Sequence, residues 1–106
     1  MEIYSLKDMV RGWFIGGFTP SVLETDKFEV GVKRYTAGAV ETTHVHKVST
    51  EITLVVEGTV HIGGKVLHAN DIIVLEPGEV SEFISETDSI LVVVKLPSVS
   101  GDKYLC

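Results

Sequence analysis

The chain has 106 residues, a length that supports one domain with a single modest core. Apolar residues make up 44% and charged residues 23% of the sequence, a balance typical of globular proteins and not of disordered ones. The formal net charge is −6, whereas phosphate contacts require clustered Lys and Arg side chains. This charge argues against a nucleic-acid partner and against docking to an anionic membrane surface.

Neither end of the chain indicates a secreted or membrane-anchored protein. The opening residues, MEIYSLKDMVRGWF, contain no basic segment followed by an apolar stretch and a cleavage site, so we expect no signal peptide. The longest apolar run, Ile90 to Val94, is too short to cross a bilayer. The single cysteine, Cys106, cannot form an intramolecular disulfide. We therefore expect a cytoplasmic protein.

Short β-rich runs alternate with turn signals along most of the chain. In order, the predicted strands are 28–35, 41–46, 51–56, 59–62, 65–67, 71–75, 80–85 and 89–96. Gly63-Gly64 is a two-residue hairpin signal between two of them. A short helix is expected only near Leu6 to Val10. This rhythm predicts an all-β sandwich or barrel formed by residues 28–106, with residues 1–27 as an N-terminal extension.

The run Ile90 to Val94 is apolar on both faces of its predicted strand. Such a strand must be covered on both sides, by the barrel interior and by something outside. The outer cover is either the N-terminal extension, in which Trp13, Phe14 and Phe18 cluster, or a second subunit. We expect a homodimer, with the extension packing on the barrel or on the partner.

Two histidines and a glutamate form a candidate metal site. His44 and His46 are two residues apart in a predicted strand, so their imidazoles project from the same face. Glu51 opens the next strand, and its carboxylate comes level with the two rings if the strands are antiparallel neighbours. Such a set suits a divalent transition metal such as Fe, Mn, Ni, Cu or Zn. The alternative is that each imidazole is exposed or satisfied by hydrogen bonds.

The spacing around these residues resembles the first signature motif of the cupin superfamily. Gly38 is followed by five residues, His44-Val45-His46, four residues, Glu51, six residues and Gly58, which matches that motif at full length. The segment from Asn70 to Ser81, with its Pro77-Gly78 turn, follows the outline of the second motif imperfectly. The resemblance covers residues 28–96. It implies a small single-domain (cupin_2-like) jelly-roll β-barrel whose interior holds the ligand site.

One position departs from the cupin pattern. The family's full ligand set is three His and one Glu, and Ser81 stands where the last His is expected. The resemblance therefore implies an incomplete site of two His and one Glu, with Ser81 contacting bound water or substrate. Either the site binds metal with an extra open position, or it binds metal weakly and His44 and His46 act as catalytic acid–base groups. Related sugar-nucleotide isomerases and epimerases work without metal in the second way.

Other residues are candidates for the substrate pocket. Arg34 continues the strand face of Phe28, Val30 and Val32 and could reach the barrel mouth to hold an anionic group; the alternative is a solvated strand end. Trp13, Tyr35 and Phe83 are candidates for pocket lining, and Phe83 shares a strand face with Ser81. As aromatic residues of a small barrel, they are alternatively plain core.

Two classes of function remain open. The first is a metal-dependent enzyme acting on a small polar, carbonyl- or sugar-like substrate as an oxygenase, a lyase or an isomerase. No nucleophile with a paired base is evident, so covalent catalysis of the Ser-His-Asp kind is disfavoured. The second class is a non-catalytic cupin domain that binds or senses a small-molecule ligand. The fold alone does not decide between them.

Overall fold

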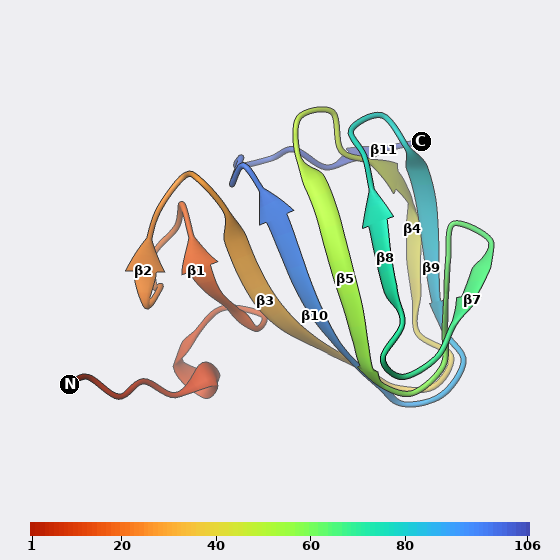
Figure 1. Cartoon of the computed structure of the whole chain (residues 1–106), viewed down its shortest axis with the longest axis horizontal. Helices are drawn as coiled ribbons and strands as arrows, with labels where there is room; N and C mark the ends of the chain where they lie inside the picture. Colours follow the sequence, from red (N-terminus) through yellow and green to blue (C-terminus); the bar gives the residue numbers. More distant parts are fainter.

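A computed structural model describes residues 1–106, which form two β-sheets facing each other (Figure 1). The elements are η1 (Leu6–Asp8), β1 (Trp13–Gly16), β2 (Leu23–Glu24), β3 (Glu29–Tyr35), β4 (Val40–Val45), β5 (Thr50–Glu57), β6 (Val60–Ile62), β7 (Lys65–Leu67), β8 (Ile72–Leu75), β9 (Val80–Ser85), β10 (Ser89–Leu96) and β11 (Tyr104–Leu105). The six-stranded sheet has the order β2-β1-β3-β10-β5-β8, and the five-stranded sheet has the order β11-β4-β9-β6-β7. The all-β jelly-roll barrel expected from the sequence is confirmed.

A small apolar core joins the two sheets. Its members are inward-facing residues of both layers: Val55, Val60, Ile62, Leu67, Leu75, Phe83, Leu91 and Val93. Strand alternation explains the selection, because on β10 the buried positions Leu91 and Val93 are two residues apart. The core occupies only part of the space between the sheets, and the rest is the cavity described below.

The eight predicted strands correspond to β3 through β10, with ends that shift by a residue or so. Three further strands, β1, β2 and β11, were not expected. β1 pairs with β3 and β2 pairs with β1, so these parts of the first 27 residues extend the six-stranded sheet. The expected helix is only the 3-10 turn η1, which buries no residue, and no helix of the chain could cross a membrane.

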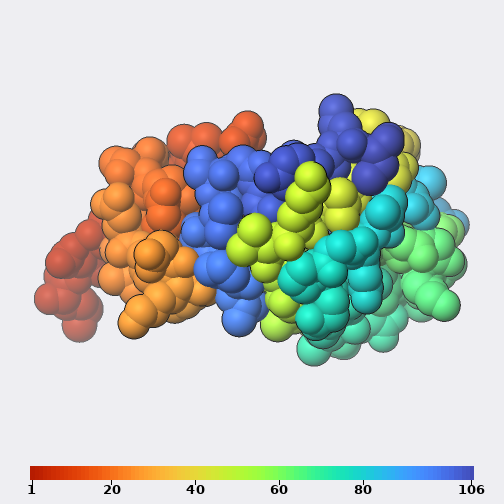
Figure 2. All heavy atoms as spheres, turned by 90° about the horizontal axis from the view of Figure 1, so that it is seen from above, coloured from red at the N-terminus to blue at the C-terminus, as the bar shows by residue number.

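The outer face of the six-stranded sheet carries two apolar rows. Strand register aligns Val30, Val94, Ile52 and Val74 in one row and Val32, Val92, Leu54 and Ile72 in the next. These eight residues, the outer rows, are all partly or fully exposed. Figures 1 and 2 both place the N-terminal segment at one end of the molecule, away from β8. Within one chain, therefore, the extension reaches this face only beside Val32 on β3 and leaves β5 and β8 uncovered.

Gly58 ends β5 with a backbone that no other residue could adopt without strain. Its φ is +95°, and a Cβ there would lie 2.4 Å from the carbonyl oxygen of Asp88. The missing side chain therefore allows the turn after β5 to approach the turn before β10. Gly38 also has a positive φ, +88°, but a Cβ at that position would meet nothing within 4 Å. Comparing substitutions at the two glycines therefore separates the cost of a positive φ from the cost of a close contact.

We expect Gly58→Ala to destabilise the barrel by more than Gly38→Ala does. Gly38→Ala should cost about 1 kcal/mol from the left-handed conformation alone, and Gly58→Ala about 3 kcal/mol because the new methyl group also displaces a backbone carbonyl. Urea unfolding of both variants, with equal m-values, measures the difference. Equal losses of stability would show that the close approach at Gly58 is unimportant.

Candidate functional site

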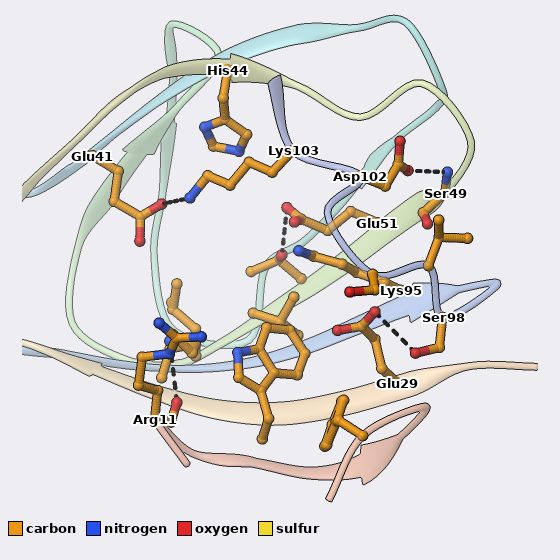
Figure 3. A pocket seen from close by; sticks show the side chains of 18 of the residues that line it. Arg11, Glu29, Glu41, His44, Ser49, Glu51, Lys95, Ser98, Asp102 and Lys103 are labelled. Carbon is orange, nitrogen blue, oxygen red and sulfur yellow. Dashed lines mark hydrogen bonds and ion pairs between the residues drawn. The ribbon is translucent and has the colours of Figure 1, made fainter. Parts of the chain in front are cut away.

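A cavity of about 620 Å³ opens between the two sheets (Figure 3). Its walls come from both layers, since β4 and β9 contribute His44 and Ser81 while β5 and β10 contribute Glu51 and Lys95. The volume is within the range of cavities that enclose small organic molecules. Charged and polar side chains face this space together with aromatic ones, which is the composition expected of a ligand site and not of a sealed core.

His44 and Ser81 face one another across paired strands. The register of β4 and β9 places His44 directly opposite Ser81, and both residues are buried against the cavity wall. The His44 Nδ1 lies 3.0 Å from the carbonyl oxygen of Thr42. Because a carbonyl can only accept, Nδ1 carries the proton in this contact and Nε2 keeps its lone pair. The structure thus places Ser81 beside the first histidine of the candidate site.

His46 presents an unpartnered nitrogen to Glu51. Its Nδ1 donates to the carbonyl oxygen of Asp102, which leaves Nε2 as the acceptor. The Nε2 atom is buried and has no hydrogen-bond partner, and it lies 3.4 Å from Glu51 Oε1. The ring stands edge-on to His44 with 5.2 Å between centroids. A buried polar atom without a partner is costly, so this nitrogen is a position where a ligand atom would be stabilising.

The His46–Glu51 pair changes the proton affinity of both residues. The Glu51 contact raises the pKa of His46, and this effect exceeds the lowering that burial causes. Burial would raise the pKa of Glu51, but His46, Lys95 and His44 together hold it below its usual value. The two side chains therefore favour a shared ion pair. A proton and a metal ion would compete for the same Nε2 atom.

Asp102 holds the loop that separates the two histidines from Glu51. Its carboxylate accepts the backbone N–H groups of Lys47, Val48 and Ser49, at 2.8 to 3.2 Å, while its carbonyl receives His46 Nδ1. The following strand, β11, pairs with β4 at His44. Figure 2 shows the dark-blue C-terminal residues lying against the yellow residues of β4. Burial would raise the pKa of Asp102, but the N–H donors hold it below its usual value.

The chemistry of the three donors fits a transition metal. Two imidazoles with Nδ1 held by carbonyls and a nearby carboxylate are a common arrangement at such centres. As the side chains stand, however, no group of three His, Cys, Asp or Glu residues is close enough to hold an ion. His44 and Glu51 line the cavity, whereas His46 lies behind its wall. Metal binding would therefore require these side chains to adjust.

The other predicted pocket residues divide into two groups. Tyr35 and Phe83 line the cavity and pack together with 4.4 Å between ring centroids. Tyr35 also donates a 2.6 Å hydrogen bond to Glu41, and burial together with this carboxylate keeps its pKa far above the usual value. Arg34 is exposed on the outer face, because the Val30 and Val32 side of β3 points away from the cavity. Its neighbour Lys33 faces the cavity instead.

Several residues of the site were not found from the sequence. Lys95 had a detectable signal, since it is a charged residue directly after the apolar run of β10. Lys33 and Glu41 lie on strands whose residues alternate between two faces, and the sequence does not show which face of each strand points into the cavity. Asp102 had no signal, because it lies in a tail whose only strand has two residues.

Replacing Asp102 should weaken the fold in a pH-dependent way. Asp102→Ala leaves three backbone N–H groups without their charged acceptor and should cost about 3 kcal/mol. Because the folded-state pKa lies below the unfolded value, this stabilisation is complete above about pH 4 and disappears as pH falls through the folded-state pKa. Unfolding titrations across acidic pH measure it. Asp71→Ala is the control, since the Asp71 carboxylate accepts one exposed N–H, from His68.

A stability difference between wild type and Asp102→Ala that stays constant to low pH would contradict the role of this carboxylate. So would an Asp71→Ala variant that loses as much stability.

Several solved structures share this architecture. A scan against family models and a search of curated proteins each give no match. A protein with a double-stranded β-helix domain from Klebsiella pneumoniae is 26% identical, with a TM-score of 0.74 over 98% of this chain and 90% of that one. An RmlC-like cupin from Shewanella frigidimarina is 25% identical, with a TM-score of 0.66 over 72% and 71%. KdgF from Halomonas sp. is 25% identical, with a TM-score of 0.65 over 72% and 74%.

The signature glycines, histidines and glutamate lie on and between β3 and β6, and His44 and Glu51 among them line the cavity. Motif and architecture agree, and the chain is a member of the cupin superfamily.

Proposed function

We propose that this cupin binds a divalent transition metal through His44, His46 and Glu51 and acts on a small polar, carbonyl- or sugar-like molecule in the adjoining cavity. The reaction class is that of a lyase, an isomerase or an oxygenase. The observation that carries this proposal is the buried, unpartnered Nε2 of His46, facing Glu51 with its proton-bearing Nδ1 held elsewhere. When His46 is neutral, the chain offers this nitrogen no donor, and a ligand atom between it and Glu51 would satisfy it; when His46 is protonated, Glu51 is its partner.

The chain's own residues would prepare both metal and substrate. A bound metal would polarise a substrate oxygen and so favour chemistry beside a carbonyl group. Hydrogen bonds to the carbonyls of Thr42 and Asp102 orient the two imidazoles. Ser81, opposite His44, offers a hydroxyl to a ligand in the cavity. Tyr35 keeps its proton, because burial and Glu41 raise its pKa, and donates it to Glu41, so towards a ligand its oxygen would act as a hydrogen-bond acceptor.

A metal-independent reaction is the second candidate, and one observation favours it. Glu51 raises the pKa of His46, so this imidazole can carry a proton close to neutral pH. With His44 unprotonated at Nε2 beside it, the pair could donate and accept protons on one substrate. A third possibility is a binding or sensing domain that uses the same cavity without turnover. Metal content separates the first candidate from the other two.

We expect the metal-free protein to bind about one equivalent of Mn²⁺, Ni²⁺ or Zn²⁺ in calorimetric titrations near neutral pH. His44→Ala and His46→Ala should each weaken binding by about 100-fold or more, because each removes one of three ligands. His61→Ala is the matched control, since His61 lies at the surface and pairs only with Glu86. Circular dichroism checks that each variant is folded.

Ser81→His adds an imidazole beside His44 and should strengthen metal binding in the same titration. Wild-type protein that binds no metal would contradict the metal proposal and leave the acid–base and binding candidates. Equal losses in His61→Ala and His46→Ala would mean that the ion binds at the surface.

We also propose that two chains associate through the outer rows of the six-stranded sheet. Two neighbouring rows of four apolar residues, without a charge between them, form a face of the kind found at subunit interfaces. The N-terminal segment leaves the rows uncovered on β5 and β8. Sheet faces of two copies could pack together at the usual spacing of about 10 Å.

Light scattering should give a particle of twice 11.6 kDa, the mass of one chain. Ile72→Lys combined with Val74→Lys should convert it to a monomer, because both residues are exposed at the edge of the outer rows. Val66→Lys, an equally exposed valine on β7, should leave the dimer intact. A wild-type monomer, or a dimer unaffected by the double substitution, would exclude this interface.

A further inference from the structure

A tryptophan and two lysines form a cluster in the cavity that the proposed metal chemistry does not use. Trp13 on β1 pairs with Gly31 on β3, where a Cβ would lie only 2.7 Å from the indole ring. The missing side chain therefore lets the indole pack directly on the β3 backbone. The ammonium groups of Lys33 and Lys95 lie 5.6 Å and 5.2 Å from the centre of this ring. We call these three side chains the Trp–Lys cluster.

Neither lysine of the cluster has a carboxylate partner. The ion pairs of the chain join His46 to Glu51, His61 to Glu86 and Lys103 to Glu41. The Lys33 ammonium donates to the Arg11 carbonyl, at 3.1 Å, whereas the Lys95 ammonium makes no hydrogen bond within the chain. An ammonium group has three donors, so both retain free donor capacity beside the cavity.

The nearby carboxylates are already engaged elsewhere. Glu29 and Glu51 flank Lys95 in register on the neighbouring strands, but neither forms an ion pair with it. Glu29 accepts a hydrogen bond from Ser98 Oγ at 3.2 Å, and Glu51 contacts His46 and the Thr53 hydroxyl. Figure 3 shows Lys95 beside Glu51 in the middle of the cavity, with Glu29 turned toward Ser98. The lysine charges are therefore only partly compensated.

The cations also repel one another. Burial is the main reason that the pKa of Lys33 is lowered, and Arg11, Lys103 and Lys95 lower it further against the opposing effect of Glu41. Four positive groups thus act on one region of the cavity wall. An anionic group that entered this region would relieve the repulsion and take up the free donors.

We propose that the Trp–Lys cluster is a subsite for the carboxylate of the ligand, so that the molecules this cavity takes are small organic acids that also carry a carbonyl or hydroxyl group. This inference rests on the proposed function, since the carbonyl or hydroxyl end would face His44 and Glu51. The indole supplies an apolar surface for the carbon skeleton next to the charged group. A carboxylate is favoured over a phosphate ester, because the chain has no α-helix whose N-terminus could cradle a phosphate at the cavity wall.

The single tryptophan of the chain is a built-in reporter for this subsite. We would titrate the metal-free protein, in chelator, with D-glucuronate, malonate, D-glucose and D-glucose 6-phosphate while recording Trp13 fluorescence. At least one of the two carboxylates should give a saturable change that weakens as salt is added, whereas glucose gives none and the phosphate ester binds more weakly. Metal binding, measured separately by calorimetry, tests the proposed function independently.

Variants assign the effect to the two lysines. Lys33→Met and Lys95→Met keep a stem over the indole but remove the charge, and each should weaken carboxylate binding by about tenfold or more. Lys95→Arg restores the charge and should recover part of the affinity. Lys65→Met, an exposed lysine on β7, is the control and should bind like wild type.

The proposal is overturned if glucose changes the fluorescence as much as glucuronate, if neither acid gives a saturable change, or if the lysine variants bind like Lys65→Met. Tighter binding of the phosphate ester would overturn the assignment to a carboxylate. Carboxylate binding with no metal binding would support the subsite and contradict the metal proposal. Metal binding with no carboxylate binding would support the metal proposal and contradict the subsite.

Discussion

Asp102 joins the C-terminal tail to the loop between β4 and β5 at the candidate site. Its carboxylate takes the N–H groups of residues 47–49, and its carbonyl takes Nδ1 of His46. Without this carboxylate, three backbone donors would lose their charged acceptor, and the one on Ser49 is buried, where an unpaired donor is costly. The loop between β4 and β5 and the second histidine therefore depend on a residue in the C-terminal tail. That tail is itself held by pairing of β11 with β4.

The hydrogen bonds that hold the two imidazoles determine which ring nitrogen of each histidine is the acceptor. Because the Nδ1 atoms of both histidines donate to carbonyls, their Nε2 atoms are the acceptors, and the one on His46 is left facing Glu51. The arrangement suits either a proton or a metal ion, and Ser81, opposite His44, lines the adjoining cavity. Next to Glu51, the Trp–Lys cluster adds positive charge that is only partly compensated. Under the two proposals, these groups select a molecule that carries both a polar reacting group and an acidic one.

The barrel was predictable because its strands carry strong alternation and turn signals. β3 through β10 follow runs such as 89–96, whose pattern does not depend on distant partners. The signature spacing from Gly38 to Gly58 predicted that His44, His46 and Glu51 would meet; His46 lies 3.4 Å from Glu51 and 5.2 Å from the His44 ring, but the three do not converge on one point. Which face of β3 points inward was not predictable, because both faces carry long or apolar side chains, and Lys33 rather than Arg34 occupies the cavity. β1, β2 and β11 are too short to carry a period, so Trp13 and Asp102 were placed only by pairing across the sheet.

The most direct measurement is a crystal structure of the protein soaked in Mn²⁺ or Zn²⁺, with anomalous scattering recorded at the metal edge. The account predicts one strong peak at about 2.0–2.3 Å from Nε2 of His44, Nε2 of His46 and an oxygen of Glu51, with Asp102 still holding the loop. A peak only at surface residues such as His61 and Glu86, or none at all with Nε2 of His46 still unpartnered, would contradict it.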